Sequence, residues 1–413
     1  MDALKPMDNA AGEYEDTARE LAEKVMAGIR RICRQLPARA PGSRGERLAA
    51  EAFAGQLRQA GCTRVQLESF PLHPQAFYGC FFWALIPELL CCLGFFLRPW
   101  LAVIFGAGTL LVMGIHFLLY REALDPLFPR VQSVNLTAIR PCRGRPEGRL
   151  LLNAHLDAAW EWPLNYRWGG IVFELQGIMS FLGLVSYTFL GIARLAGAGA
   201  WTRRAGLVCL GFLPFWIALA LLRDPRRVVD GANDNLSGCC IAVELMKAMA
   251  GEDRLSEHTE LGVVLTGAEE CGLRGAKAWC RAHREEFRDV PTYILSFDTI
   301  HDPAWLMVNR RDLNGLVRAD RELADRFLRA AKAAGVPCRP GWVPPLGGAT
   351  DAAAFTQGGF RAVSVTGLSH RLERYYHTRR DSWDNLNPLG LRNCLKAALH
   401  MLREFESAPD PEP

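Results

Sequence analysis

The chain lacks the cysteine spacings that indicate a structural zinc module or a disulfide framework. Its 413 residues include 13 cysteines, an odd number, and no two of them form a C-x-x-C pair. An odd number of cysteines with irregular spacing is typical of reduced thiols in a cytosolic protein. We therefore expect free cysteines and no zinc held by thiolates.

The chain also lacks a large excess of charge of one sign, since its formal net charge is only +4. No basic patch favours nucleic acid as a partner. The N-terminus reads Met-Asp-Ala-Leu-Lys-Pro and continues with acidic residues. It has no basic region followed by a short apolar one, so we expect no cleavable signal peptide. No internal repeat is present.

Apolar residues make up half of the chain, and they concentrate in residues 77–120 and 169–222. Each segment contains two apolar runs, and each run is close to the length that crosses about 30 Å of hydrocarbon as a helix. The pattern predicts two transmembrane hairpins and hence a lipid bilayer as partner. The alternative for each segment is a helical hairpin buried in a soluble domain. Glu88, next to Pro87, would be costly in lipid and is expected to face protein.

The arginines that flank the apolar segments predict the orientation. Tips of the hairpins carry fewer of them than the flanks next to the rest of the chain. By the positive-inside bias, we expect a cytoplasmic catalytic domain and four membrane-spanning helices. The tip residues are Arg98, Arg194, Arg203 and Arg204, and the flanking ones are Arg121, Arg130, Arg167, Arg223, Arg226 and Arg227.

Outside the apolar segments, strand patterns alternate with helix patterns. We expect an α/β fold with a mixed, mainly parallel central sheet flanked by helices. The catalytic domain is then discontinuous, with residues 407–413 as a disordered tail. Expected strands cover residues 65–70, 131–139, 149–154, 261–265, 293–297, 305–309 and 362–366, and expected helices 17–36, 47–60, 236–250, 275–284, 321–334 and 391–405. The domain segments are residues 14–75, 121–168 and 223–406, with hairpins at 77–120 and 169–222.

Polar residues follow three of these strands directly. His155 and Asp157 follow the expected strand 149–154. Glu269 and Glu270 follow the strand 261–265, and Asp298 follows the strand 293–297. In open α/β sheets, functional sites lie at the carboxyl ends of the strands. Two further candidates are Asp234, just before a helix, and His377, in the sequence Tyr-His-Thr.

Histidine and carboxylate ligands without cysteine suit a hydrolytic zinc site rather than a structural one. Two histidines and three carboxylates are too many for one catalytic zinc. They fit two metals that share a bridging carboxylate, roughly 3.5–4 Å apart. One glutamate of the Glu269–Glu270 pair would then remain to take the proton from the attacking water.

These motifs resemble the M28 zinc aminopeptidases of the bacterial leucyl aminopeptidase type. The resemblance covers roughly residues 21–65 and 133–405, apart from the second apolar segment. The matching pieces are Asn153-Ala154-His155-Leu156-Asp157, Gly231-Ala232-Asn233-Asp234-Asn235-Leu236-Ser237-Gly238, residues 266–273, Ser296-Phe297-Asp298, Gly348-Ala349-Thr350-Asp351 and Tyr376-His377-Thr378-Arg379-Arg380-Asp381.

The resemblance implies a role for each residue and two zinc ions per chain. Asp234 would bridge the two zincs. His155 and Asp298 would complete one site, and Glu270 and His377 the other. Glu269 would be the general base, and Asp157 would orient His155. Asp351 and Tyr376 are expected near the substrate pocket, where Asp351 has a structural role as its alternative.

Four functions remain open from the sequence. The resemblance favours an aminopeptidase that hydrolyses the first bond of a peptide with a free N-terminus. The second apolar segment begins shortly after Asp157, which places the site near the membrane and also suits an amidase for N-acyl amino acids. A cyclase similar to glutaminyl cyclases would not need His155. A receptor or scaffold of the same fold would lack ligands, and here all five are present.

Overall fold

The structure, a computed structural model, describes residues 5–251, 256–369 and 371–407. Of the expected disordered tail, residues 408–413 lie outside this part. An eight-stranded sheet forms the centre, in the order β1-β2-β4-β3-β5-β10-β6-β9. Its strands are β1 (Arg64–Leu72), β2 (Val131–Arg140), β3 (Gly148–His155), β4 (Thr259–Thr266), β5 (Thr292–Ile300), β6 (Leu306–Asn309), β9 (Arg339–Gly341) and β10 (Arg361–Gly367).

Strands β4, β3, β5 and β10 run parallel in the middle of the sheet, while β1 and β2 add an antiparallel edge and β6 pairs antiparallel with β10. Every residue of β5 is buried, which is the continuous burial of a strand covered on both faces. The mixed, mainly parallel sheet confirms the fold class expected from the sequence. Two short strands, β7 (Arg311–Asp312) and β8 (Val317–Arg318), form a separate ribbon.

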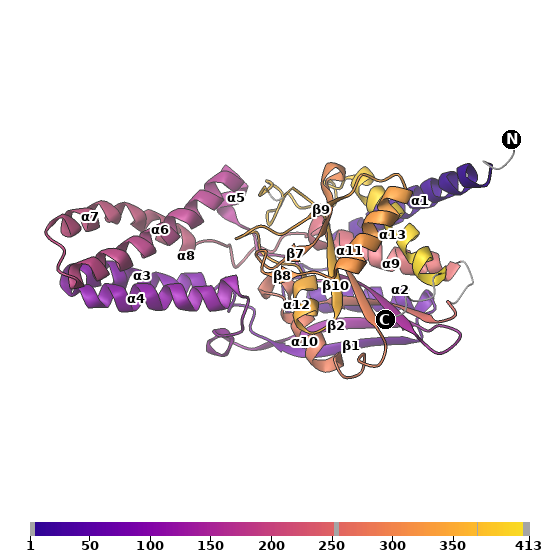
Figure 1. Ribbon diagram of the computed structural model, residues 1–413, viewed down its shortest axis with the longest axis horizontal. Helices are drawn as coiled ribbons and strands as arrows, with labels where there is room; N and C mark the ends of the chain where they lie inside the picture. The colour runs from indigo at the N-terminus through magenta and orange to yellow at the C-terminus, as the bar shows by residue number, and fades with distance from the viewer. Residues whose placement is uncertain (1–4, 252–255, 370, 408–413) are drawn as a thin grey trace.

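Helices cover both faces of the sheet (Figure 1). Alternate residues of β3 show the two sides, because Leu150 and Leu152 belong to one apolar core and Leu151 to the other. The first core takes in residues of helices α1 (Lys5–Gln35), α2 (Arg44–Gln59), α9 (Ser237–Gly251), α11 (Arg321–Ala333) and α13 (Pro388–Ser407). The second takes in residues of α10 (Arg274–His283) and α12 (Asp351–Gln357).

The expected elements are all present. Most of their ends are shifted by a few residues, and the largest shift is in α1, which was expected from residue 17 and begins at Lys5. Helices α5 (Pro163–Trp168) and α12 and strands β7 to β9 were not expected, because elements of two to seven residues are too short to show a period.

The two apolar hairpins form one helical bundle that projects from the α/β body (Figure 1). Hairpin 1 consists of α3 (Cys80–Leu97) and α4 (Pro99–Met113), which continues as a π-helix to Leu118. Hairpin 2 consists of α6 (Gly170–Leu195), α7 (Trp201–Cys209) and α8 (Leu213–Ala220), the last two joined by a short 3-10 turn. Residues of both hairpins, such as Phe95, Tyr187 and Trp216, share one buried cluster.

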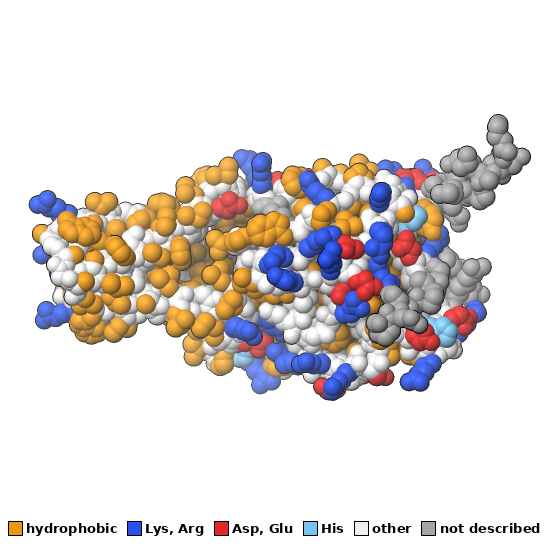
Figure 2. Space-filling view, viewed as in Figure 1, with side chains coloured by type: hydrophobic (Ala, Val, Ile, Leu, Met, Phe, Trp, Pro, Cys, Tyr) orange, Lys and Arg blue, Asp and Glu red, His pale blue; other side chains and the backbone are white. Residues whose placement is uncertain are grey.

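The surface of the bundle is apolar, and its polar side chains point inward. Figure 2 shows hydrophobic side chains over its length, with Lys and Arg at its far tip. Inside, Gln176 and Ser180 donate to the Phe215 carbonyl, and Tyr187 donates to that of Gly206. Glu88 is also buried, as expected of a carboxylate that faces protein.

Between 11% and 44% of each apolar window is buried, so these are not helices enclosed in a soluble domain. The four helices are long and apolar enough to cross a membrane, and we treat them as candidate spans.

Polar contacts attach the bundle to the body at both hairpins. Behind hairpin 1, the buried Arg274 of α10 forms two 2.8 Å hydrogen bonds to Asp125 and donates to the Tyr120 carbonyl. Before hairpin 2, Glu161 accepts two side-chain hydrogen bonds from Arg379, of 2.6 and 2.7 Å. Both attachments join the hairpin ends to loops that carry candidate site residues.

Removing Arg274 tests the first attachment. Arg274→Leu leaves the Asp125 carboxylate buried without its partner, and we expect a loss of about 3–5 kcal/mol in the free energy of unfolding. The matched control is Arg143→Leu, whose pair with Glu257 is more than half exposed and should contribute about 0–1 kcal/mol. Denaturant unfolding of both variants in one detergent compares them, and equal losses would contradict the prediction.

Candidate metal centre

The candidate ligands lie at one end of the parallel strands, as the sequence predicts. His155 is the last residue of β3, and it pairs in register with Thr266 at the end of β4. After β4, the backbone of Ala268 adopts the left-handed conformation, with φ of 54°, and the 3-10 turn Glu269–Cys271 follows. Asp298 lies near the end of β5, which pairs with β3 on the other side. The sheet therefore places three of the five ligand-bearing segments next to one another.

Asp234 is the centre of the arrangement. Its Oδ1 lies 3.1 Å from His155 Nε2, and its Oδ2 lies 3.1 Å from His377 Nε2. His377 Nε2 also lies 3.2 Å from Glu270 Oε1. Each oxygen of one carboxylate thus faces a different imidazole, which is the arrangement needed to bridge two metals.

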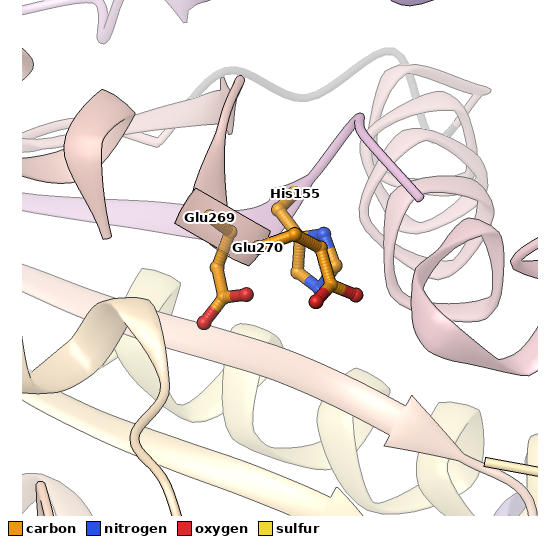
Figure 3. Close-up of side chains that lie close together, drawn as sticks. All are labelled: His155, Glu269 and Glu270. Carbon is orange, nitrogen blue, oxygen red and sulfur yellow. The ribbon is translucent and has the colours of Figure 1, made fainter. Parts of the chain in front are cut away.

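Three groups of side chains bring potential ligand atoms within 4.8 Å of one another. The first is His155, Asp234 and Asp298, and the second is Asp234, Glu270 and His377. These are the two sets implied by the resemblance, and they share Asp234. The third is His155, Glu269 and Glu270 (Figure 3). Figure 3 shows the Glu270 carboxylate against the His155 ring and the Glu269 carboxylate to one side.

Buried hydrogen bonds hold the backbone on either side of Asp234. Asp381 accepts from the main-chain N–H groups of Asn233 and Asp234, at 2.7 and 3.1 Å. Asn235 donates to the Phe297 carbonyl at the end of β5, and its Oδ1 accepts from Gly238 at the start of α9. The carboxylate of Asp234 is therefore fixed by neighbours on both sides rather than by its own chain alone.

Asp157 joins the two segments that follow β3 and β4. Its Oδ1 accepts from the Glu269 N–H and its Oδ2 from the Glu270 N–H, both at 3.0 Å. Oδ1 also lies 3.5 Å from His155 Nδ1, and the Asp157 carbonyl lies 3.2 Å from the same nitrogen. One carboxylate can thus orient an imidazole and hold the Glu269–Glu270 turn.

The electrostatics of the cluster follow from burial and from the number of acids. Burial raises the pKa of Asp298 to about 7 and also raises the pKa of Glu270 and Glu269, with repulsion from neighbouring carboxylates adding to it. For Asp234, burial is outweighed by hydrogen bonds to His155 and His377, which lower its pKa. The pKa of His377 rises to about 10, because the carboxylates around it outweigh burial.

The donor set fits divalent metal ions. Two imidazoles and four carboxylates converge, and none of the three ligand groups includes a cysteine, as in hydrolytic zinc sites. The buried Oε1 of Glu270 lies 3.2 Å from His377 Nε2 but forms no hydrogen bond of good geometry with any described residue. Burying an oxygen acceptor without a donor is unfavourable, and a bound metal ion would satisfy this oxygen.

Asp351 and Tyr376, expected at the substrate pocket, lie in different surroundings. Asp351 is buried at the start of α12 and accepts a hydrogen bond from the Thr266 hydroxyl at the end of β4. It is outside all three ligand groups. The Tyr376 ring stacks on the His377 imidazole with centroids 4.2 Å apart, and it is only partly buried. Tyr376 thus packs on one metal-ligand candidate and is partly exposed, whereas Asp351 is buried next to the end of β4.

Sequence reasoning gave no individual role to several residues that build the site. Asp381 was part of a matching motif, but its contact with Asp234 needs the folded loop. Glu46, one residue before the expected helix start, accepts from the Ala268 N–H behind the glutamate turn. Trp162, whose ring lies 4.2 Å from that of His377, stands in the linker to hairpin 2 and carried no recognisable pattern.

The fold and the candidate site together are those of a metal-dependent hydrolase. Residues 221–402, which are less than half of the chain, match the sequence profile of "Peptidase family M28". This segment contains Asp234, Glu269, Glu270, Asp298 and His377. The match and the fold indicate a metallopeptidase and hence a hydrolase. No curated protein matches the chain.

Solved structures with the same fold include both peptidases and a cyclase. The zinc aminopeptidase BSAP from Bacillus subtilis is 14% identical with a TM-score of 0.57, over 93% of this chain and 94% of that one. The LapA aminopeptidase of Legionella pneumophila is 13% identical with a TM-score of 0.54, over 97% of this chain and 76% of that one. Glutaminyl cyclase of Porphyromonas gingivalis is also 13% identical with a TM-score of 0.54, over 93% of this chain and 98% of that one. At this identity the likeness shows the fold, which the aminopeptidase and cyclase functions share.

Asp157→Asn tests whether Asp157 positions the metal ligands. An amide oxygen can accept from one of the two N–H groups, but the amide nitrogen repels the other, so the turn and His155 lose their support. We expect zinc affinity to fall by about 10–100-fold, measured by competition with a chromogenic chelator. Asp320→Asn is the control, because asparagine caps α11 as well as aspartate does. Unchanged affinity in Asp157→Asn would contradict this role.

Proposed function

We propose that the chain is a membrane-anchored aminopeptidase with two zinc ions, which hydrolyses the N-terminal bond of peptides. The observation that carries the proposal is the position of Asp234, whose two oxygens face the imidazoles of His155 and His377. In this proposal, His155 and Asp298 hold one zinc, Glu270 and His377 hold the other, and Asp234 bridges them. The proposed catalytic unit comprises residues 14–75, 121–168 and 223–406.

The number of charges supports two metal ions rather than one. Asp234, Asp298, Glu269 and Glu270 would carry four negative charges when ionised, in a cluster that is largely buried. Two divalent ions balance four carboxylates, whereas one would leave unpaired buried charge. When bound, such ions lower the pKa of a coordinated water and polarise the substrate carbonyl.

Glu269 has the position of a general base. Its carboxylate belongs to the cluster but to neither of the two sets that share Asp234. It is also less buried than Glu270, so it faces the opening where substrate and water would enter. In the proposed reaction, Glu269 takes the proton from the attacking water and passes it to the leaving amine. Asp157 holds the main-chain N–H of Glu269 and so fixes the base.

One observation favours a second candidate, an amidase for lipid-like substrates such as N-acyl amino acids. Trp162 lies against His377, and it also stacks in parallel on Phe173 of α6, with centroids 4.4 Å apart. A residue of hairpin 2 thus contributes to the aromatic wall beside the cluster. An acyl chain could follow this wall from the bilayer to the site.

Hydrolysis of matched substrates separates the two candidates. The full chain in detergent, supplied with zinc, is given aminoacyl amides with a free amino group and the same compounds with an N-acyl chain. We expect cleavage of the free amines, and a fall in kcat of about 10²–10⁴-fold in Glu269→Gln, because the base is lost. Zinc measured by mass spectrometry in the same samples should be two per chain in both proteins.

The control is Glu257→Gln, since Glu257 is mostly exposed and precedes β4, whereas Glu269 follows the other end of that strand. Activity only on acylated substrates would replace the aminopeptidase by the amidase. One zinc per chain would contradict the bridging role of Asp234. Wild-type zinc binding without activity on either substrate would favour a receptor or scaffold.

The orientation in the membrane is tested by thiol labelling. Cys142 is partly exposed on the turn between β2 and β3, in the body. If the body is cytoplasmic, a membrane-impermeant maleimide should label Cys142 in inverted vesicles and not in intact cells. Comparison with Cys142→Ser identifies the labelled site. Labelling of Cys142 in intact cells would reverse the proposed topology.

A further inference from the structure

Exposed apolar side chains of the body gather next to the bundle. Among the described residues outside the helices of the bundle and their flanking turns, only seven large apolar side chains are exposed. Six of them lie on segments that lead to or contact the base of the bundle. These are Leu127, Val131, Trp168, Leu316, Trp342 and Leu346, and the exception is Leu389.

Hydrogen bonds place three of them, on loops far apart in the sequence, at the base of hairpin 1. Asn314, in the turn between β7 and β8, donates to the Leu118 carbonyl at the end of hairpin 1. The same residue exchanges main-chain and side-chain hydrogen bonds with Gly348, and the Trp342 ring packs on Gly315. Figure 1 shows β7 and β8 on the side of the body nearest the bundle. Leu316, Trp342 and Leu346 thus project from loops beside the point where hairpin 1 ends.

Arginines accompany these apolar residues around the base of the bundle. Arg374 lies beside Gly169 at the start of α6. Several more arginines are exposed and form no ion pair among the described residues, and Figure 2 shows Lys and Arg where the apolar surface meets the body. They are Arg121, Arg130, Arg167, Arg226 and Arg371. Exposed acids are fewer here: Glu174 and Glu373 are exposed and Glu122 and Asp224 are partly buried, while Asp125 and Glu161 are buried in ion pairs.

We propose that this surface is a second membrane contact, made by the catalytic body itself, and that it sets the candidate metal centre in the headgroup layer. We call it the rim and define it by Leu316, Trp342, Leu346, Trp168 and the arginines named above. The rim is continuous with the apolar bundle. Tryptophan and leucine beside arginine suit the boundary between hydrocarbon and phosphate.

The occupant that fits the rim is the bilayer interface, with a preference for anionic phospholipids. Each arginine near a negatively charged leaflet adds to the electrostatic attraction to it. The inference rests on the proposed function and adds a substrate class to it. Because the loop with Leu346 runs directly into Thr350 and Asp351, beside the cluster, substrates would reach the site along the membrane surface. They would be peptides whose N-terminus lies at the interface.

Photo-crosslinking tests the rim without relying on activity. The full chain is placed in nanodiscs of radiolabelled phosphatidylcholine and phosphatidylglycerol, with p-benzoylphenylalanine at one position. Leu346→p-benzoylphenylalanine and Trp342→p-benzoylphenylalanine should crosslink to lipid. Leu389→p-benzoylphenylalanine, at an exposed apolar position off the rim, should not. Leu93→p-benzoylphenylalanine, on the exposed surface of α3, reports on the bundle.

The outcomes separate the inference from the proposed function. Crosslinking at 93 without crosslinking at 346 and 342 would overturn the rim and leave the membrane anchor in place. No crosslinking at 93 would overturn the anchor and the rim together. Crosslinking at 389 as strong as at 346 would show unspecific contact and would also overturn the inference.

Kinetics in the same nanodiscs test the substrate class. Leu346→Ser should raise KM several-fold for a peptide attached through its C-terminal end to phosphatidylethanolamine, and leave hydrolysis of the free peptide unchanged. Leu389→Ser should change neither. An equal effect of Leu346→Ser on both peptides would mean a general disturbance of the body and would contradict interfacial substrate selection.

Discussion

The candidate site depends on one carboxylate placed between two imidazoles. Asp234 reaches His155 with one oxygen and His377 with the other, although these residues come from segments far apart in the chain. Burying so many acids together is costly unless cations balance them. The surrounding structure holds the acids in place, through Asp381 beneath Asp234 and Asp157 beneath the Glu269–Glu270 turn. Every other feature of the site either positions these groups or limits access to them.

Hydrogen bonds also join the candidate site to the helical bundle. The segment before hairpin 2 contains Glu161, which binds Arg379. It also contains Trp162, whose main-chain N–H donates to the main-chain carbonyl of His377. The segment after hairpin 1 is held by Arg274, which follows the glutamate turn in sequence. A metallopeptidase thus has its candidate site built against helices that are apolar enough to cross a membrane.

Much of the fold and of the candidate site was predictable, because each depends on local patterns. The buried strands appear as apolar runs, and their carboxyl ends carry His155, Glu269, Glu270 and Asp298. A parallel sheet brings such ends together whatever the details of packing. The apolar hairpins were equally visible from hydropathy. By contrast, Glu46 and Asp381 act through contacts with backbone N–H groups in distant loops, and such contacts leave no local pattern.

By itself, the sequence determined the class of fold, the metal-binding chemistry and the presence of four apolar helices, since periodicity and residue type are local properties. Only the tertiary structure decided that the two hairpins share one core and that Asp234 divides its oxygens between two histidines. It also decided that Trp342 and Leu346 lie beside the base of hairpin 1 while Leu389 does not. These are distances between segments remote in the chain, and only the packing of the whole molecule sets them.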